Sequence, residues 1–348
     1  MVVVFKTLRR LCTVRKQISF IVILLLVVLW NVWNQYHHLS NVSISFKRLR
    51  KSVFAMINIK DFFDTTSSTS LPISCHSCFV HRYQYVLNNA NICGARNRTR
   101  SIRIIIIIFT KHENFRQREA LRQTWLRASK RNTDKIRYAF VLGTSPNNRL
   151  QTALETENSI HNDIIQQNFL DSYRNLTLKT VTALKWASDY CGHAEFLMKT
   201  DDDVFVNTEA LLATLSQHKS QLQESVGGYC WSKEKPNRQR DSKWYISYKM
   251  YPKKYFPGFC SGTGYVTSIR VAKKLFDVSK NVPLLPLEDV YIGLCLRALR
   301  MSVTTIKGFN FEKVPLGCIY HSNDLITSHQ LDPSNLKTVW RLKCHNRN

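Results

Sequence analysis

The feature that most constrains the fold of this chain is a β-branched run at residues 102–109, with the sequence IRIIIIIF. Valine and isoleucine favour extended backbone because their side chains are stiff at χ1. A strand with apolar residues on both faces must be covered on both faces. The run therefore predicts a buried strand with packing layers above and below it.

The segments around this run alternate between helical and extended patterns. Helical patterns cover residues 113–129, 150–162 and 178–190, and strand-like patterns cover residues 136–143, 164–165 and 195–200. Such alternation is typical of an α/β domain. We therefore expect a mainly parallel central sheet flanked by helices.

Three consecutive carboxylates, Asp201, Asp202 and Asp203, follow the last of these strands. At the end of a buried strand they repel one another and lose hydration, so a cation is expected to join them. Carboxylate oxygens suit Mg²⁺ or Mn²⁺. In extended backbone Asp201 and Asp203 share one face and Asp202 points the other way. The alternative is a solvated acidic turn, although ligands of α/β sheets do gather at this end of the strands.

The amino terminus predicts the compartment. Residues 1–16 carry five basic residues and no acidic one, and residues 18–33 carry no charge. A cleaved signal peptide is the alternative, but aromatic residues follow where small ones would mark cleavage. We expect a cytosolic tail at 1–17, a signal-anchor span at 18–36, a lumenal stem at 37–100 and a catalytic domain at 101–348. The short span suits a thin Golgi bilayer.

The formal net charge of +26 favours anionic partners. In a lumenal protein nucleic acid is not an expected partner, which leaves sugars activated by diphosphates. Three glycosylation acceptor sites fit the same compartment, at Asn41, Asn97 and Asn175.

Nine of the ten cysteines lie beyond the predicted span. Cys75 and Cys78 have the spacing of a zinc pair, but no second pair follows, so disulfides in an oxidising lumen are expected instead. Because nine is odd, at least one thiol is free or pairs between chains, which leaves a homodimer open.

Three further segments carry candidate site residues. Arg118 and Arg122 share a helix face and could clamp a diphosphate, or form a solvated basic face. Glu288 and Asp289 begin a helical segment, where they could cap it or supply a general base. The third segment is rich in aromatic residues and glycine and could hold a sugar ring; its candidates are Trp244, Tyr245, Gly262 and Gly264.

In this order and spacing the motifs resemble the β-1,3-galactosyltransferase family of inverting type II Golgi glycosyltransferases, which have a GT-A fold. The motifs are Arg118-x-x-x-Arg122-x-Thr-Trp, the triple Asp, Cys260-Ser-Gly-x-Gly-Tyr and Glu288-Asp289-Val-Tyr-x-Gly. The resemblance covers residues 102–344. It implies transfer of galactose from UDP-galactose to the 3-hydroxyl of an acceptor glycan on a glycoprotein, glycolipid or proteoglycan, with inversion.

The resemblance also implies roles for the residues around the donor. Asp203 would hold Mn²⁺, Asp201 would lie nearer the nucleoside and Asp202 would support them. A late histidine completes the metal ligands in the family; His329 matches its position and His321 is the competitor.

At the other side of the reaction, Asp289 would act as base and the two arginines would neutralise the departing UDP. Trp244, Tyr245, Gly262, Gly264 and Glu288 are the expected substrate contacts. The alternatives left open are transfer of N-acetylglucosamine or N-acetylgalactosamine, an inactive lectin or folding partner, and a glycoside hydrolase.

Overall fold

The computed structural model of the chain describes residues 75–94 and 101–344. All of them belong to one of two compact units, Ser70–Asn348. The predicted tail, the predicted span, most of the predicted stem and the sites at Asn41 and Asn97 lie outside the described residues. Within the described ranges, no helix is both long enough and apolar enough to cross a membrane.

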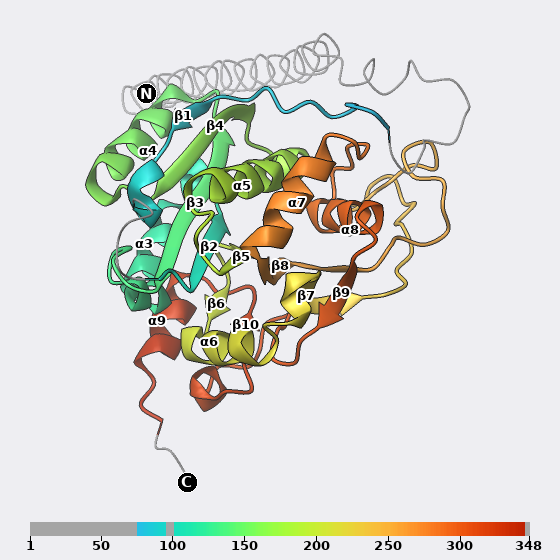
Figure 1. Ribbon diagram of the computed structural model, residues 1–348. Coiled ribbons are helices and arrows are strands. Elements are labelled where there is room, and N and C mark those ends of the chain that lie inside the picture. Colours follow the sequence, from blue (N-terminus) through green and yellow to red (C-terminus); the bar gives the residue numbers. More distant parts are fainter. Residues whose placement is uncertain (1–74, 95–100, 345–348) are drawn as a thin grey trace, which may run out of the picture. The chain divides into compact units, whose positions relative to one another are not determined.

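An eight-stranded sheet forms the centre of this unit, in the order β1-β4-β3-β2-β5-β8-β7-β9 (Figure 1). Strands β4, β3, β2 and β5 run parallel to one another, whereas β8 is antiparallel to β5 and β7, and β1 is antiparallel to β4. The predicted α/β class with a mainly parallel sheet is confirmed. The strands are β1 Tyr85–Leu87, β2 Ile104–Phe109, β3 Ile136–Thr144, β4 Ile164–Leu170, β5 Phe196–Asp201, β7 Ser225–Trp231, β8 Phe259–Ser268 and β9 Ser302–Thr305.

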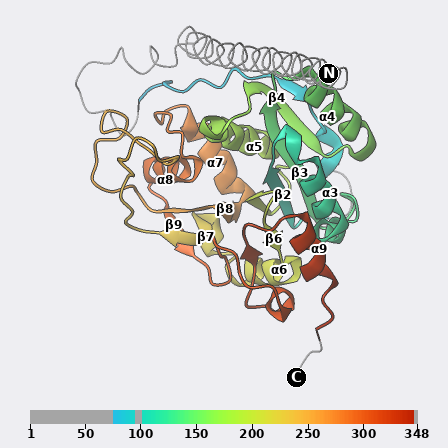
Figure 2. The same cartoon turned by 180° about the vertical axis from the view of Figure 1, so that it is seen from behind.

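Helices cover both faces of the sheet, as the β-branched run predicts (Figures 1 and 2). Ile105 and Ile107 pack toward the layer of α5, α7 and α8. Ile104, Ile106 and Ile108 pack toward the layer of α3, α4, α6 and α9. The helices are α3 Phe115–Gln123, α4 Asn148–His161, α5 Leu176–Tyr190, α6 Thr208–Gln217, α7 Ile269–Ser279, α8 Glu288–Ala298 and α9 Pro333–Arg341.

Short 3-10 helices occupy several connections: η1 Ala90–Cys93, η2 His112–Asn114, η3 Trp125–Ser129, η4 Tyr173–Asn175, η5 Gln221–Gln223 and η6 Cys318–His321. The helix expected at 113–129 is therefore α3 with a 3-10 turn at each end. Strand β4 is longer than the expected pair 164–165. The residue after this pair, Gln166, is polar but fully buried. Its side-chain amide is satisfied there by donating to the Gly143 carbonyl at 2.9 Å.

A second, two-stranded sheet brings a late segment back to the aspartates. Strand β10, Thr327–Ser328, pairs antiparallel with β6, Phe205–Val206. Helix α9 follows at once, with Asp332 capping its first turn by accepting from the Asn335 N–H at 2.8 Å. This pairing places the residues before α9 beside the loop after β5.

The structure places the start of the folded body before residue 101, the expected boundary. Strand β1 extends the sheet beside β4, and the Cys93–Cys191 disulfide ties the end of this segment to α5. The pairs are Cys75–Cys78, Cys93–Cys191, Cys230–Cys260 and Cys318–Cys344. The expectation of disulfides, made without assigning the pairs, agrees with these bonds, and Cys75 and Cys78 bond to each other. Cys295 is the free thiol of the described part, and its burial keeps it from a second chain.

Candidate functional site

Two of the three aspartates and one histidine form a cluster at the carboxyl end of β5. Ligand atoms of Asp201, Asp203 and His329 all lie within 4.8 Å of one another. The nearest contact is 3.2 Å, between His329 Nε2 and Asp203 Oδ2. His321 lies elsewhere, with its Nε2 2.8 Å from the Val339 carbonyl of α9. Of the two candidate histidines, His329 is therefore the one beside the aspartates.

The ring of His329 is oriented by the backbone. Its Nδ1 lies 3.0 Å from the Phe311 carbonyl, which assigns the Nδ1–H as donor and directs Nε2 toward Asp203. Burial lowers the pKa of His329, but the hydrogen bond to Asp203 and its negative charge outweigh burial and raise that pKa overall. Two carboxylates and one imidazole nitrogen are ligands that a divalent transition metal accepts.

Asp202 points away from this cluster, as alternation along extended backbone predicts. Its carboxylate is buried and accepts from Thr110 Oγ1 at 2.5 Å and Asn114 Nδ2 at 2.8 Å. Burial raises the pKa of Asp202 to about 6, against the lowering effect of these two donors. Asp202 therefore anchors the loop to the end of β2 and the start of α3.

Gln117 of α3 braces the two segments that carry the cluster. Its Nε2 donates to the carbonyls of Asp202 and Leu331, both at 2.8 Å. The Leu331 N–H in turn donates to the Asp203 carbonyl at 2.9 Å. These bonds join the loop after β5 to the segment after β10, so the positions of Asp203 and His329 are coupled.

The two arginines do not have the environment expected of a diphosphate clamp. Arg118 is 1% exposed and pairs with both carboxylate oxygens of Glu157, at 2.8 and 2.5 Å. Arg122 pairs with Asp163 at 2.9 Å and with Glu157 at 2.7 Å. Both guanidinium groups are thus engaged by carboxylates of the chain. Arg118 also donates to Thr110 Oγ1 at 3.2 Å, so it supports the residue that holds Asp202.

A buried lysine joins the metal side of the site to the start of α8. Lys199 Nζ lies 2.8 Å from Asp201 Oδ1 and 3.0 Å from Glu288 Oε1, and it donates to the Gly262 carbonyl. Glu288 also accepts from Thr180 at 2.9 Å and Tyr265 at 3.1 Å. Glu288 thus holds together β5, α5 and β8 through Lys199, Thr180 and Tyr265.

Asp289 lies next to Glu288 at the first turn of α8 and is only half-buried. Its carboxylate accepts from its neighbour's backbone, the Val290 N–H, at 2.8 Å and from the Gly262 N–H. Burial, followed by the negative charge of Glu288, raises the pKa of Asp289 to about 7. A carboxylate that titrates near neutral pH and reaches solvent has the properties of a general base.

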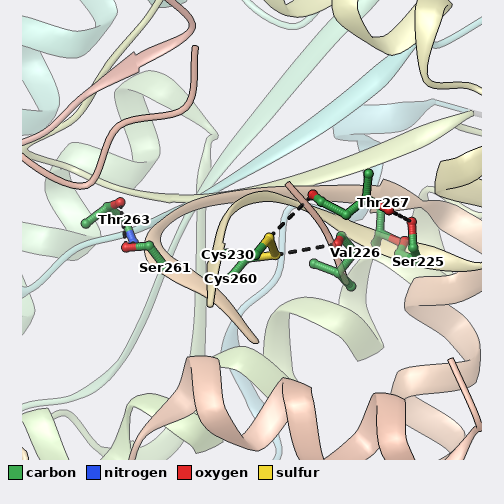
Figure 3. The surroundings of a disulfide bond; sticks show 8 residues. Ser225, Val226, Cys230, Cys260, Ser261, Thr263 and Thr267 are labelled. Atoms are coloured by element: carbon green, nitrogen blue, oxygen red, sulfur yellow. Dashed lines mark hydrogen bonds between the residues drawn. A yellow bond between two sulfur atoms is a disulfide. The ribbon is translucent and has the colours of Figure 1, made fainter. Parts of the chain in front are cut away.

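The two glycines allow close packing within the protein. A Cβ on Gly262 would lie 2.6 Å from Glu288 Oε1, and one on Gly264 would lie 3.3 Å from Thr327 Cγ2. On the side where a Cβ would stand, Glu288 packs against Gly262 and β10 packs against Gly264. Just before Gly262, Cys260 is bonded to Cys230 across the ladder of β8 and β7 (Figure 3).

An aromatic group lies within electrostatic reach of Asp289. Trp244 is exposed and Tyr245 is half-buried, and Lys243 Nζ lies 4.5 Å from the centroid of the Trp244 ring and 5.9 Å from that of Tyr173. Burial raises the pKa of Tyr173, and the charge of Asp289 adds to the rise. Near Tyr173, the side-chain amide of Asn175, a predicted glycosylation site, donates to the Leu170 carbonyl at 2.7 Å.

Sequence reasoning missed several of these residues: Thr110, Asn114, Gln117, Tyr173 and Lys199. Thr110 and Tyr173 follow the carboxyl ends of β2 and β4, where ligands of parallel sheets collect, so strand ends could have indicated them. Lys199 could have been inferred as the buried cation beside three carboxylates. Asn114 of η2 and Gln117 of α3 carry no such signal, because only the fold brings their amides to the aspartates.

Comparison with known proteins gives one consistent family. A family model described as Galactosyltransferase matches residues 116–307. β-1,3-Galactosyltransferase 2 of Mus musculus and of Homo sapiens are 39% identical over 266 residues, 75% of this chain and 62% of theirs. This chain therefore spans about 62% of the length of those relatives. β-1,3-Galactosyltransferase 1 of Mus musculus is 37% identical over 262 residues, 75% of this chain and 78% of that protein.

Similarity to solved structures is remote. A glycosyltransferase involved in glycosylation of the major capsid of PBCV-1 matches with a TM-score of 0.36 and 9% identity, covering 68% of this chain and 98% of that one. A score this low supports no inference about the site.

Proposed function

The chain belongs to the galactosyltransferase family, and we propose that it transfers galactose from UDP-galactose to the 3-hydroxyl of an acceptor glycan, forming a β-1,3 linkage with inversion. The observation that carries the proposal is the pairing of two groups. The cluster of Asp201, Asp203 and His329 lies on one side, and Asp289 lies on the other. Lys199 links the two sides by pairing with Asp201 and with Glu288, the neighbour of Asp289.

The side chains supply the acid–base part of this reaction. The acceptor hydroxyl attacks the anomeric carbon, the bond from that carbon to the diphosphate breaks, and UDP departs with the bonding electrons. Asp289 takes the hydroxyl proton, for which a pKa of about 7 is well matched. The Val290 and Gly262 N–H groups hold its carboxylate in place. Positioning of the two substrates accounts for most of the remaining acceleration.

The acidic cluster suits a divalent cation such as Mn²⁺. Its donor atoms are carboxylate oxygens and one imidazole nitrogen, and the Nδ1–H bond to Phe311 leaves His329 Nε2 available. When bound, such a cation neutralises the negative charge of the diphosphate. Asp203 and His329 are its proposed main ligands, Asp201 lies on the same side, and Asp202 supports the loop from behind.

Transfer assays with the purified chain test the proposal. UDP-galactose, UDP-N-acetylglucosamine and UDP-N-acetylgalactosamine are compared as donors, with and without EDTA, and the linkage formed is determined by NMR. We expect a β-1,3-galactosyl product, loss of activity with EDTA and its return with Mn²⁺. Asp203→Asn should lose transfer without loss of folding. Full activity of that variant, or release of free sugar without UDP, would refute the proposal.

We also propose a GT-A arrangement held in the Golgi membrane by residues 18–36, with the folded unit in the lumen. Four disulfides among the described residues support an oxidising compartment. Protease protection in intact microsomes tests the topology, because the folded unit should resist digestion until detergent is added.

A further inference from the structure

A long loop between β7 and β8, residues 232–258, borders the site and is strongly basic. We call it the basic loop. It has eight lysines and arginines against two acidic residues. The Cys230–Cys260 disulfide closes its base; Figure 3 shows this bond, with Cys260 Sγ 3.4 Å from the Val226 carbonyl. Arg238 is used inside the loop, since it donates to the carbonyls of Ile246 and Tyr251 at 2.7 and 2.8 Å.

The base of this basic loop is packed against the helix that carries Asp289. Figure 1 shows the loop on the α8 side of the sheet. A Cβ on Gly293, one turn after Asp289, would lie 2.6 Å from the Gly258 carbonyl and 3.1 Å from Phe259 Cβ. Contact this close requires glycine in α8. The disulfide and this contact together hold the loop at a defined position beside Asp289.

The tip of the basic loop presents an aromatic ring with an ammonium group over it. Lys243 Nζ lies 4.5 Å from the centroid of the Trp244 ring and 5.9 Å from that of Tyr173. The Trp244 side chain is about half exposed, with 52% of its surface accessible. An exposed indole can stack against the C–H face of a sugar ring, since its body is apolar and its edge is polar.

The position of this pair relative to Asp289 follows from Tyr173. Lys243 Nζ lies 5.9 Å from the centroid of its ring, and the pKa of Tyr173 is raised first by burial and then by the charge of Asp289. Tyr173 also follows the carboxyl end of β4, at the same end of the parallel strands as the aspartates. It therefore lies near the loop tip and within electrostatic reach of the proposed base. A sugar stacked on Trp244 would be on the acceptor side of the reaction.

The ammonium of Lys243 is available to a ligand. It is exposed, and within the described ranges it forms no ion pair with a carboxylate. The same holds for five other basic residues of the loop: Lys233, Lys235, Arg240, Lys253 and Lys254. Cations left without acidic partners beside a binding surface attract anions and repel other cations.

We propose, on the basis of the proposed transferase function, that the acceptor is a glycan bearing a sulfate or carboxylate group, which Lys243 binds while Trp244 stacks on the sugar ring. The donor diphosphate is the other anion of the reaction, but the aspartate cluster lies on its side of the site. The cation proposed at that cluster matches the charge of the diphosphate, so we assign the charge of the basic loop to the acceptor.

The test compares acceptors that differ only in one anionic group. Methyl β-galactoside and methyl β-N-acetylglucosaminide are each used in neutral form and as the 6-sulfate, which leaves the 3-hydroxyl free. The quantity measured is kcat/KM for the sulfated acceptor divided by that for the neutral one. For one exposed charge pair we expect a ratio of about 5, falling as salt is added.

Variants then assign the preference to the loop. Lys243→Gln should bring the ratio close to 1, and Lys243→Glu should bring it below 1. Lys135→Gln is the matched control, because Lys135 is exposed and precedes β3, at the end of the parallel strands opposite the aspartates. It should retain the ratio of the unaltered chain. Equal efficiency with neutral and sulfated acceptors, or a preference that Lys243→Glu leaves intact, would overturn the inference while the transferase function stands.

A direct binding measurement tests the anion site separately from the transferase function. Calorimetric titration of the 6-sulfates into the chain with UDP and Mn²⁺ requires no turnover. Sulfate-dependent binding that is lost in Lys243→Glu, without transfer to any acceptor, would refute the transferase function and support the anion site. Binding to phosphatidylserine vesicles that depends on Lys243, without any preference for sulfated sugar, would refute the inference in favour of a membrane surface.

Discussion

Replacement of Lys199 by methionine tests how the two halves of the site are held together. Lys199 is 3% exposed and lies between Asp201, at 2.8 Å, and Glu288, at 3.0 Å. Burial lowers its pKa, but the charges of Asp201 and Glu288 outweigh burial and raise it overall, so the ammonium stays charged. Methionine matches the length of the lysine stem and removes only the charge and its hydrogen bonds.

The cost follows from what remains after the charge is removed. Breaking a buried ion pair by removing one partner costs about 3–5 kcal/mol, because the other charge is left without compensation. Glu288 is 4% exposed but keeps the donors Thr180 and Tyr265, and Asp201 is partly open to solvent. We therefore expect the lower end, a loss of about 3 kcal/mol in the free energy of unfolding.

A second substitution identifies the cause of the loss. In the double variant Lys199→Met with Glu288→Gln, the stranded charge is gone while the amide oxygen still accepts from Thr180 and Tyr265. The double variant should therefore recover about half of the lost stability, since the desolvation penalty of the charge is removed. Lys185→Met is the control, because its pair with Asp189 is exposed and contributes about 0.5 kcal/mol or less.

Urea unfolding followed by tryptophan fluorescence measures these three variants and the single variant Glu288→Gln against the unaltered chain. A loss below about 1 kcal/mol in Lys199→Met would show that the ion pairs contribute little net free energy. Additive losses in the double variant would show that the stranded Glu288 charge is not the cause. Either result would refute the reasoning.

Three further predictions concern the base and its surroundings. Because the pKa of Asp289 is raised to about 7, its basic form is lost as pH falls. We therefore expect kcat/KM to drop about tenfold per pH unit below about 7 and to level off above it. Asp289→Asn should abolish this pH dependence, and a flat pH profile of the unaltered chain would contradict the prediction. Gly262→Ala should destabilise the chain by about 1–3 kcal/mol in urea unfolding, since its Cβ would lie 2.6 Å from Glu288 Oε1; an unchanged midpoint would contradict this. Replacing Cys230 and Cys260 together by serine should lower the free energy of unfolding by about 3–4 kcal/mol, because the disulfide closes a loop across a sequence separation of 30 residues. The same urea unfolding assay measures this loss, and a loss below about 1 kcal/mol would contradict the prediction.

Much of the fold was predictable because its signals are local. The β-branched run at 102–109 predicts a doubly covered strand, and β2 is buried on both faces. The alternation of Asp201, Asp202 and Asp203 predicts two carboxylates on one side and one on the other, and the hydrogen bonds of Asp202 to Thr110 and Asn114 agree. The outcome agrees with the prediction, but parity along a strand does not explain it, because β5 ends at Asp201 and the next two residues form a turn.

The roles of the charged residues were harder to predict. Arg118 and Arg122 look like a clamp for an anion, yet Glu157 and Asp163 engage them in the fold. Gly262 looks like a site of ligand approach, yet Glu288 fills the space beside it. In each case the competing partner lies far away in the chain, and a single sequence does not state which carboxylate meets which cation.

The amino-acid sequence alone determined the α/β class, the place of the aspartates at a strand end and the identity of the chemical groups, because hydrophobic periodicity and residue type are local properties. Tertiary structure alone decided which groups meet. It selected His329 over His321 by pairing β10 with β6, made Lys199 the link between Asp201 and Glu288, and placed Trp244 beside Tyr173. Contacts between distant segments depend on the register of strands and the packing of helices, which arise only when the whole core forms.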